Sequence, residues 1–150
     1  MWFMSKIANP LVRLILRSPF HGMLSAALLL ITYHGCKSGK EYTLPIQYAQ
    51  DKKTIYIIPG APENKIWWRN LCRGAPVQIL LAGKSLSGEA NVLQGNTCTQ
   101  LIARALDCYM QRFPATANNY NIRAGHDGSF DRDDLRRAAS STVVVCVNLE

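Results

Sequence analysis

A turn rich in glycine and lysine, Tyr33-His34-Gly35-Cys36-Lys37-Ser38-Gly39-Lys40, separates two apolar segments of the chain. The two glycines let the backbone reverse sharply, so the flanking segments are expected to be neighbouring strands. Glycine also lets successive N–H groups approach an anion, while the serine hydroxyl and the lysine ammonium groups add donors and positive charge. The turn therefore predicts a hairpin that binds phosphate or carboxylate. An exposed turn whose lysines serve solubility is the alternative.

The spacing within this turn excludes a P-loop, which has four residues between its glycines and then Lys-Ser or Lys-Thr. Here three residues separate Gly35 from Gly39, and Lys40 is followed by Glu41. The turn is therefore not the phosphate loop of an ATPase.

Length, charge and cysteine content restrict the remaining choices. A chain of 150 residues is expected to form one domain, residues 1–150. Its net charge of +7 predicts an anionic partner. The five cysteines are an odd number without a C-x-x-C pair, so we expect neither a disulfide framework nor a metal site, and a cytoplasmic location.

The N-terminal segment, residues 1–18, is predicted to be an amphipathic helix, with a mobile segment as the alternative to one packed on the domain. Asn9-Pro10 is a typical helix start, and the apolar positions that follow predict a helix over 10–17. The later apolar run from Met23 to Tyr33 is about eleven residues, whereas a membrane-spanning helix needs about twenty. Packing of the basic helix on the domain is expected, with peripheral contact at the inner face of the membrane as the alternative.

The rest of the chain predicts several strands and one long helix. Strands are expected at Leu28 to Tyr33, Tyr42 to Ala49, Thr54 to Ile58 and Val143 to Val147, with a hairpin around Gly83-Lys84 made by Pro76 to Ala82 and Glu89 to Leu93. Pro45 places its strand at a sheet edge or a bulge. Helices are expected at Lys65 to Leu71 with Asn64 as N-cap, at Thr97 to Phe113, and from Asp131 through Ala139, with a polar loop between Ala115 and Ser129. Strands in a meander with one long helix predict a mainly β, α+β fold.

Four features in order complete a wider pattern: Thr32-Tyr33-x-Gly35-x-Lys37-Ser38-Gly39, Pro45, Pro59-Gly60 and Trp67-Trp68-Arg69-Asn70-Leu71. This pattern resembles the nitroreductase and quinone reductase family that uses the deazaflavin coenzyme F420. The resemblance implies a PNP-oxidase-like split β-barrel of six or seven strands, with an N-terminal helix and one long helix. Its partners would be a small-molecule electron acceptor and, as in many split barrels, a second copy of the chain in a homodimer, with a monomer as the alternative.

The resemblance also implies where the cofactor lies. The turn would hold the phosphate tail through Lys37 and Ser38, the coenzyme ring would lie beside Trp67, and Asn70 would close the groove. The full cofactor-binding set implied is Cys36, Lys37, Ser38, Gly39, Thr43, Leu44, Pro45, Ile46, Gln47, Ile58, Pro59, Gly60, Trp67, Trp68, Arg69 and Asn70. Cys36 stands where members of the family usually carry arginine, and Tyr42 where some members carry arginine or another basic residue. Both departures are expected to weaken tail binding by about 1–3 kcal/mol for each charged hydrogen bond lost.

The expected activity is hydride transfer from F420H2 to a quinone, nitroaromatic or enone. Tyr109 and Tyr120 are the candidate catalytic proton donors, with packed core aromatics as the alternative for both. FMN in the same groove is the alternative cofactor, and a non-enzymatic protein that binds an anionic ligand or lipid is the alternative of another class. Nucleic acid is not an expected partner, because the basic residues do not cluster with exposed aromatics along one element.

Overall fold

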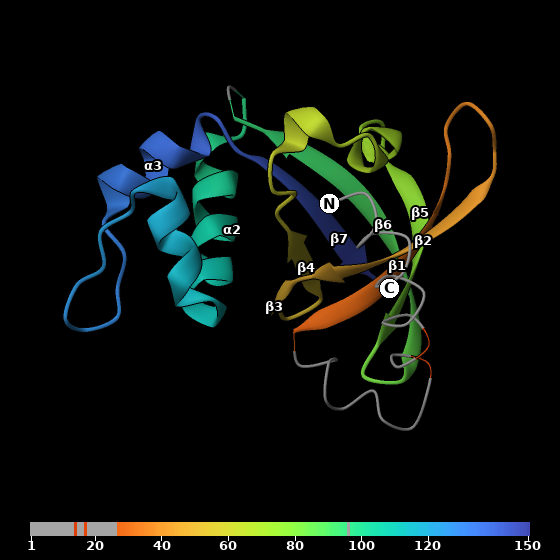
Figure 1. Cartoon of the computed structure of the whole chain (residues 1–150), viewed down its shortest axis with the longest axis horizontal. Helices are drawn as coiled ribbons and strands as arrows, with labels where there is room; N and C mark the ends of the chain where they lie inside the picture. Colours follow the sequence, from red (N-terminus) through yellow and green to blue (C-terminus); the bar gives the residue numbers. More distant parts are fainter. Residues whose placement is uncertain (1–13, 15–16, 18–26, 96) are drawn as a thin grey trace.

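The computed structural model describes residues 14, 17, 27–95 and 97–150, and these residues form one antiparallel sheet with helices at one end (Figure 1). The seven strands are β1 (Leu28–His34), β2 (Glu41–Gln47), β3 (Ala49–Asp51), β4 (Thr54–Ile57), β5 (Ala75–Leu81), β6 (Lys84–Gln94) and β7 (Val143–Leu149). The mainly β, split-barrel prediction is confirmed, and every predicted strand overlaps an observed one.

The strand order is β2-β1-β5-β6-β7-β4-β3, so the predicted meander is wrong. β7, the last strand of the chain, pairs with both β6 and β4 in the middle of the sheet. The physical reason lies in its composition, because Val144, Val145 and Val147 are fully buried and such a strand needs a neighbour on each side. β2 lies at an edge of the sheet, which is where its Pro45 can be tolerated.

A single residue, Tyr48, separates β2 from β3, although these two strands lie at opposite ends of the strand order. One residue spans only about 3.5 Å. The sheet must therefore curl until its two edges approach each other at Tyr48, which makes the half-closed barrel. The predicted strand from Tyr42 to Ala49 runs through this point, and its last residue belongs instead to β3.

Two apolar cores fill the molecule. The first lies inside the curled sheet and includes Leu29, Ile55, Ile79 and Val147. The second lies between the sheet and the helices α2 (Thr99–Arg112) and α3 (Arg132–Ala139), where Ile102, Leu106, Met110 and Val144 are fully buried. Figure 1 shows both helices on the opposite side of the molecule from the β1–β2 hairpin.

The helical predictions need three corrections. The helix expected from Lys65 is a 3₁₀ helix, η3 (Trp67–Leu71), whose N-cap residue is Ile66. Asn64 is not its cap, because Pro62 starts a separate 3₁₀ turn, η2 (Pro62–Asn64), after a left-handed Ala61. The predicted loop from Ala115 to Ser129 begins with a further 3₁₀ helix, η4 (Pro114–Tyr120).

Asp131 caps α3 as predicted, since its carboxylate accepts hydrogen bonds from the N–H groups of Asp133 and Asp134. Asp134 is itself buried, and it ties the preceding segment to the helix. Its Oδ2 accepts from the backbone N–H of Arg123 at 3.0 Å and from Arg123 Nε at 2.8 Å. The Arg123 side-chain and backbone hydrogen bonds hold the pKa of the Asp134 carboxyl below its usual range.

We expect Asp134→Asn to make the protein less stable at neutral pH and to flatten its acid denaturation. The native carboxyl has a lowered pKa, so its stabilisation is fully present above the pKa of the unfolded chain and is lost as pH falls through the lower native pKa. Chemical denaturation between pH 7 and pH 2 measures this, with Asp133→Asn as the control for loss of one exposed charge. Parallel pH profiles for wild type and Asp134→Asn would contradict the prediction.

Among the described residues no helix is long and apolar enough to cross a membrane. The predicted helix over 10–17 and the membrane contact assigned to residues 1–18 lie almost wholly outside the part of the chain that the structure describes.

Candidate functional site

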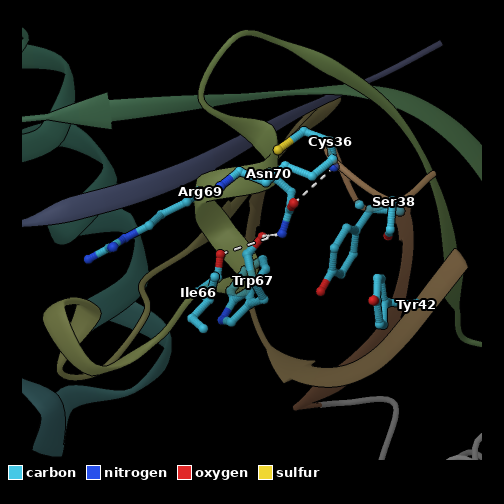
Figure 2. Close-up of a pocket in the computed structure, with 10 residues that line it drawn as sticks. Cys36, Ser38, Tyr42, Ile66, Trp67, Arg69 and Asn70 are labelled. Carbon is cyan, nitrogen blue, oxygen red and sulfur yellow. Dashed lines mark hydrogen bonds between the residues drawn. The ribbon is translucent and has the colours of Figure 1, made fainter. Parts of the chain in front are cut away.

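A pocket of about 670 Å³ opens between the β1–β2 hairpin and η3 (Figure 2). Its lining comes from two segments far apart in the sequence: Tyr33, Gly35, Cys36, Lys37, Ser38 and Tyr42 from the hairpin, and Ile66, Trp67, Arg69 and Asn70 from η3 and the residue before it. This volume lies within the range that holds a small molecule or cofactor.

The turn has a defined backbone structure that depends on its two glycines. Gly35 N–H donates to the Lys40 carbonyl and Gly39 N–H to the Gly35 carbonyl, both at 2.8 Å. Gly39 has a φ of 69°, a conformation that favours glycine. A Cβ on Gly35 would lie 2.8 Å from Ser38 Oγ and 3.1 Å from Tyr42 Cε2. Any larger residue at position 35 would therefore make the Ser38 and Tyr42 side chains shift.

Asn70 connects the turn to η3. Its Oδ1 accepts a hydrogen bond from the Cys36 N–H at 3.0 Å, and its Nδ2 donates to the Trp67 carbonyl at 3.1 Å (Figure 2). The side chain thus binds both walls of the pocket at once. It holds the turn at a set distance from Trp67.

Three aromatic side chains form the apolar part of the pocket. Tyr33 and Tyr42 are directly paired across β1 and β2, and their rings stack with centroids 5.6 Å apart and planes at 25°. Trp67 lies on the other wall with its ring centroid 6.3 Å from that of Tyr33. Such surfaces suit a flat conjugated ring.

The charge of the lining is positive. Lys37 and Arg69 are exposed, no carboxylate lines the pocket, and neither cation forms an ion pair with any residue in the described part of the chain. The Arg69 guanidinium lies over the Trp68 ring at 5.4 Å, and Figure 2 shows it extending away from Ser38 and Tyr42. Lys37 is consequently the lining cation carried by the turn itself.

The structure brings together six of the predicted cofactor-binding residues and places the others elsewhere. Cys36, Lys37, Ser38, Trp67, Arg69 and Asn70 line the pocket. Gly39, Thr43, Leu44, Pro45, Ile46, Gln47, Ile58, Pro59, Gly60 and Trp68 do not. Trp68 is buried, and its Nε1 donates to the Pro62 carbonyl at 2.9 Å, so of the two adjacent tryptophans Trp67 faces the pocket.

The alternation of β2 explains why most of its residues lie outside the pocket. Leu44 and Ile46 share a face with Tyr42 but pack against the first core, further along the strand. Thr43 is on the other face, where its hydroxyl is 2.9 Å from that of Thr32. A second, smaller depression on this other face is lined by Thr43, Thr32, Gln78 and Arg17 among others.

Tyr109 and Tyr120 do not line the pocket. Tyr109 is a buried residue of α2, and Tyr120, at the end of η4, packs against the second core. Burial, together with the neighbouring Tyr120, raises the pKa of Tyr109 to about 12, and burial also raises the pKa of Tyr120. Their role as proton donors stays a prediction.

Sequence reasoning missed four lining residues, namely Tyr33, Gly35, Tyr42 and Ile66. The two tyrosines could have been found from the hairpin, because they are equally far from the centre of the turn and hence opposite each other. No signal in the sequence points to Ile66, since its place depends on the path of the chain through η2 and η3.

The residues present fit F420, whose parts are a tricyclic ring, a phosphodiester and an oligoglutamate tail. The turn and Lys37 provide anion donors, the aromatic walls provide a surface for the ring, and the space is adequate. An open, curled antiparallel sheet with a glycine- and lysine-rich turn beside an aromatic pocket defines a protein of the split β-barrel fold. The chain belongs to the F420H(2)-dependent quinone reductase family, whose model matches residues 18–123. Coenzyme F420 is the cofactor that this family uses.

A curated relative agrees with this family, and solved structures agree with the fold. The chain is 27% identical over 84 residues to "Putative F420H(2)-dependent quinone reductase Rv3178" of Mycobacterium tuberculosis, a match that covers 54% of this chain and 71% of that protein. An F420-H2 dependent reductase, FDR-A, has a similar fold with a TM-score of 0.57 and 16% identity, over 81% of this chain and 94% of that one. A structure described as a domain-swapped dimer matches with a TM-score of 0.59 and 15% identity, over 98% of this chain and 97% of that one.

Proposed function

We propose that this chain is an F420H2-dependent oxidoreductase that reduces a quinone bound in the pocket between the β1–β2 hairpin and η3. One observation carries the proposal: the anion-binding turn and Trp67, about thirty residues apart in the sequence, line the same pocket. A phosphate-bearing cofactor with a flat ring needs both features within its own length.

Each part of the site has a separate task. The bound coenzyme supplies a hydride. Lys37 and Ser38 bind the phosphate, and Trp67 packs against the coenzyme ring. Asn70 holds the turn and η3 together through its hydrogen bonds to Cys36 and Trp67. The aromatic walls also hold the ring and the acceptor against each other, which favours transfer of the hydride between them.

The acceptor is proposed to be a flat, conjugated, electron-poor molecule. Quinones, nitroaromatics and enones all have this shape, and the stacked Tyr33 and Tyr42 offer a matching surface. Quinones come first, because the family is defined by quinone reduction.

Parallel titration of the purified protein with F420 and with FMN tests the cofactor. We expect F420 to quench tryptophan fluorescence at lower concentration than FMN, because Trp67 lies in the pocket. Oxidation of F420H2 in the presence of a quinone, a nitroaromatic or an enone then ranks the acceptors. Tighter binding of FMN than of F420 would indicate that FMN is the cofactor. Absence of quenching by both compounds would favour the non-enzymatic alternative.

A homodimer is proposed as the assembly. The support is indirect: split barrels often pair, and a solved structure of similar fold is described as a domain-swapped dimer. Light scattering of the purified protein measures the mass, for which one chain contributes 16.7 kDa.

A further inference from the structure

The Tyr33 hydroxyl is a polar group on a buried residue of the pocket wall. The residue is 4% exposed, and its hydroxyl makes no hydrogen bond to any of the described residues. Buried hydroxyls are almost always hydrogen-bonded, and an exception calls for a ligand or water in contact with the group. Tyr33 lines the pocket, so what satisfies its hydroxyl is expected to be bound there.

The ring that carries this hydroxyl is firmly positioned. It stacks on Tyr42 on one side and packs beside Trp67 on another, and the Tyr33 backbone pairs with Tyr42 of β2. These contacts hold the ring, and with it the hydroxyl oxygen, in place. The free energy needed to position the hydroxyl is supplied by folding, before an acceptor binds.

We propose that Tyr33 Oη is a catalytic group of this site, which hydrogen bonds to an oxygen of the quinone and gives its proton to that oxygen during reduction. This inference rests on the proposed function. The hydride brings two electrons and one hydrogen to the quinone, the hydroxyl brings the second hydrogen as a proton, and the product is the hydroquinone. Water entering past the partly exposed Tyr42 returns a proton to the Tyr33 phenolate, while the proton that leaves the coenzyme with its hydride passes to solvent.

The other protonated groups of the lining suit this role less well. Tyr42 is 42% exposed, so water competes for its hydroxyl. Lys37 and Ser38 belong to the anion-binding turn, and Cys36 lies on it as well. Burial first, and then the neighbouring Tyr42, raise the pKa of the Tyr33 hydroxyl, which therefore holds its proton at neutral pH before each turnover.

Tyr33→Phe tests the proposal, because it keeps the stacked ring and removes only the hydroxyl. With 2-methyl-1,4-naphthoquinone as acceptor we expect kcat to fall about 100-fold, the usual effect of losing a general acid. The dissociation constant of F420 should change less than about threefold, because the Tyr33 hydroxyl contacts the quinone and not the coenzyme. Tyr56→Phe, in a buried tyrosine outside the pocket, is the matched control and should leave kcat unchanged.

A second measurement does not depend on turnover. Quenching of tryptophan fluorescence by the same naphthoquinone in the coenzyme-free protein gives its dissociation constant. We expect this constant to rise about fivefold in Tyr33→Phe, the effect of one lost neutral hydrogen bond, and to stay constant in Tyr56→Phe. The carbonyl stretching frequency of the bound naphthoquinone should also move toward its value in apolar solvent.

The results separate this inference from the proposed function. If wild type binds F420 and reduces the naphthoquinone, the proposed function holds, and an unchanged kcat or unchanged naphthoquinone affinity in Tyr33→Phe overturns the role of Tyr33. A loss of kcat confined to Tyr109→Phe or Tyr120→Phe overturns it as well and assigns the proton to those residues. If wild type neither binds F420 nor reduces the quinone, the proposed function fails and the inference fails with it.

Discussion

Replacing Lys37 with alanine is expected to weaken F420 binding by about 10- to 100-fold, because one charge-assisted hydrogen bond to phosphate is lost. The effect should be large since Lys37 is the lining cation on the turn and has no ion pair in the described part of the chain. Arg69 extends away from the turn, and Cys36 and Tyr42 carry no positive charge, so few other donors can compensate.

Fluorescence titration with F420 at low and high salt measures this prediction. Lys84→Ala is the matched control, because it removes the same charge from an exposed position outside the pocket. We expect the control to bind as wild type does at moderate salt, where distant surface charges are screened. Equal weakening in both variants would show that net charge, and not the turn, attracts the coenzyme.

Gly95→Ala is expected to be the most damaging small substitution in the described chain. A Cβ at this position would overlap the Ser140 carbonyl group and lie 2.7 Å from the Ala139 carbonyl oxygen, both at the end of α3. These are backbone atoms, so relief requires the connection between β6 and α2 to move away from α3. We expect a loss of about 3 kcal/mol, which lowers Tm by roughly 6–12 °C in a chain of this size.

Thermal and chemical denaturation of Gly95→Ala measure the loss. Gly60→Ala is a suitable control, because the nearest atom to its added Cβ is Lys65 Nζ at 4.0 Å. The control should unfold within about 0.5 kcal/mol of wild type. A Gly95→Ala protein as stable as the control would mean that α3 shifts at little cost.

Local patterns in the sequence predicted the parts of this fold whose contacts are close along the chain. The turn at Gly35 to Lys40 predicted the β1–β2 hairpin, since a tight reversal brings its two flanks side by side. Asp131 predicted the start of α3, because a cap acts within one turn of a helix. The prediction of Asn64 as a cap was wrong because it too rested on local pattern alone. A residue type that often caps helices does not reveal that Pro62 starts a separate turn ending at Asn64.

What the sequence by itself determined is the chemistry of each segment: a turn able to bind an anion, a tryptophan pair on a short helix, and strands of alternating or continuous apolar character. Tertiary structure alone decided which of these segments meet. The sheet curls until β2 and β3 approach at Tyr48, and Asn70 reaches Cys36 across 34 positions of sequence. Contacts of that separation depend on the whole strand order, and no local propensity encodes it. For this reason Tyr33, an ordinary strand residue in the sequence, becomes a buried donor beside Trp67 in the folded chain.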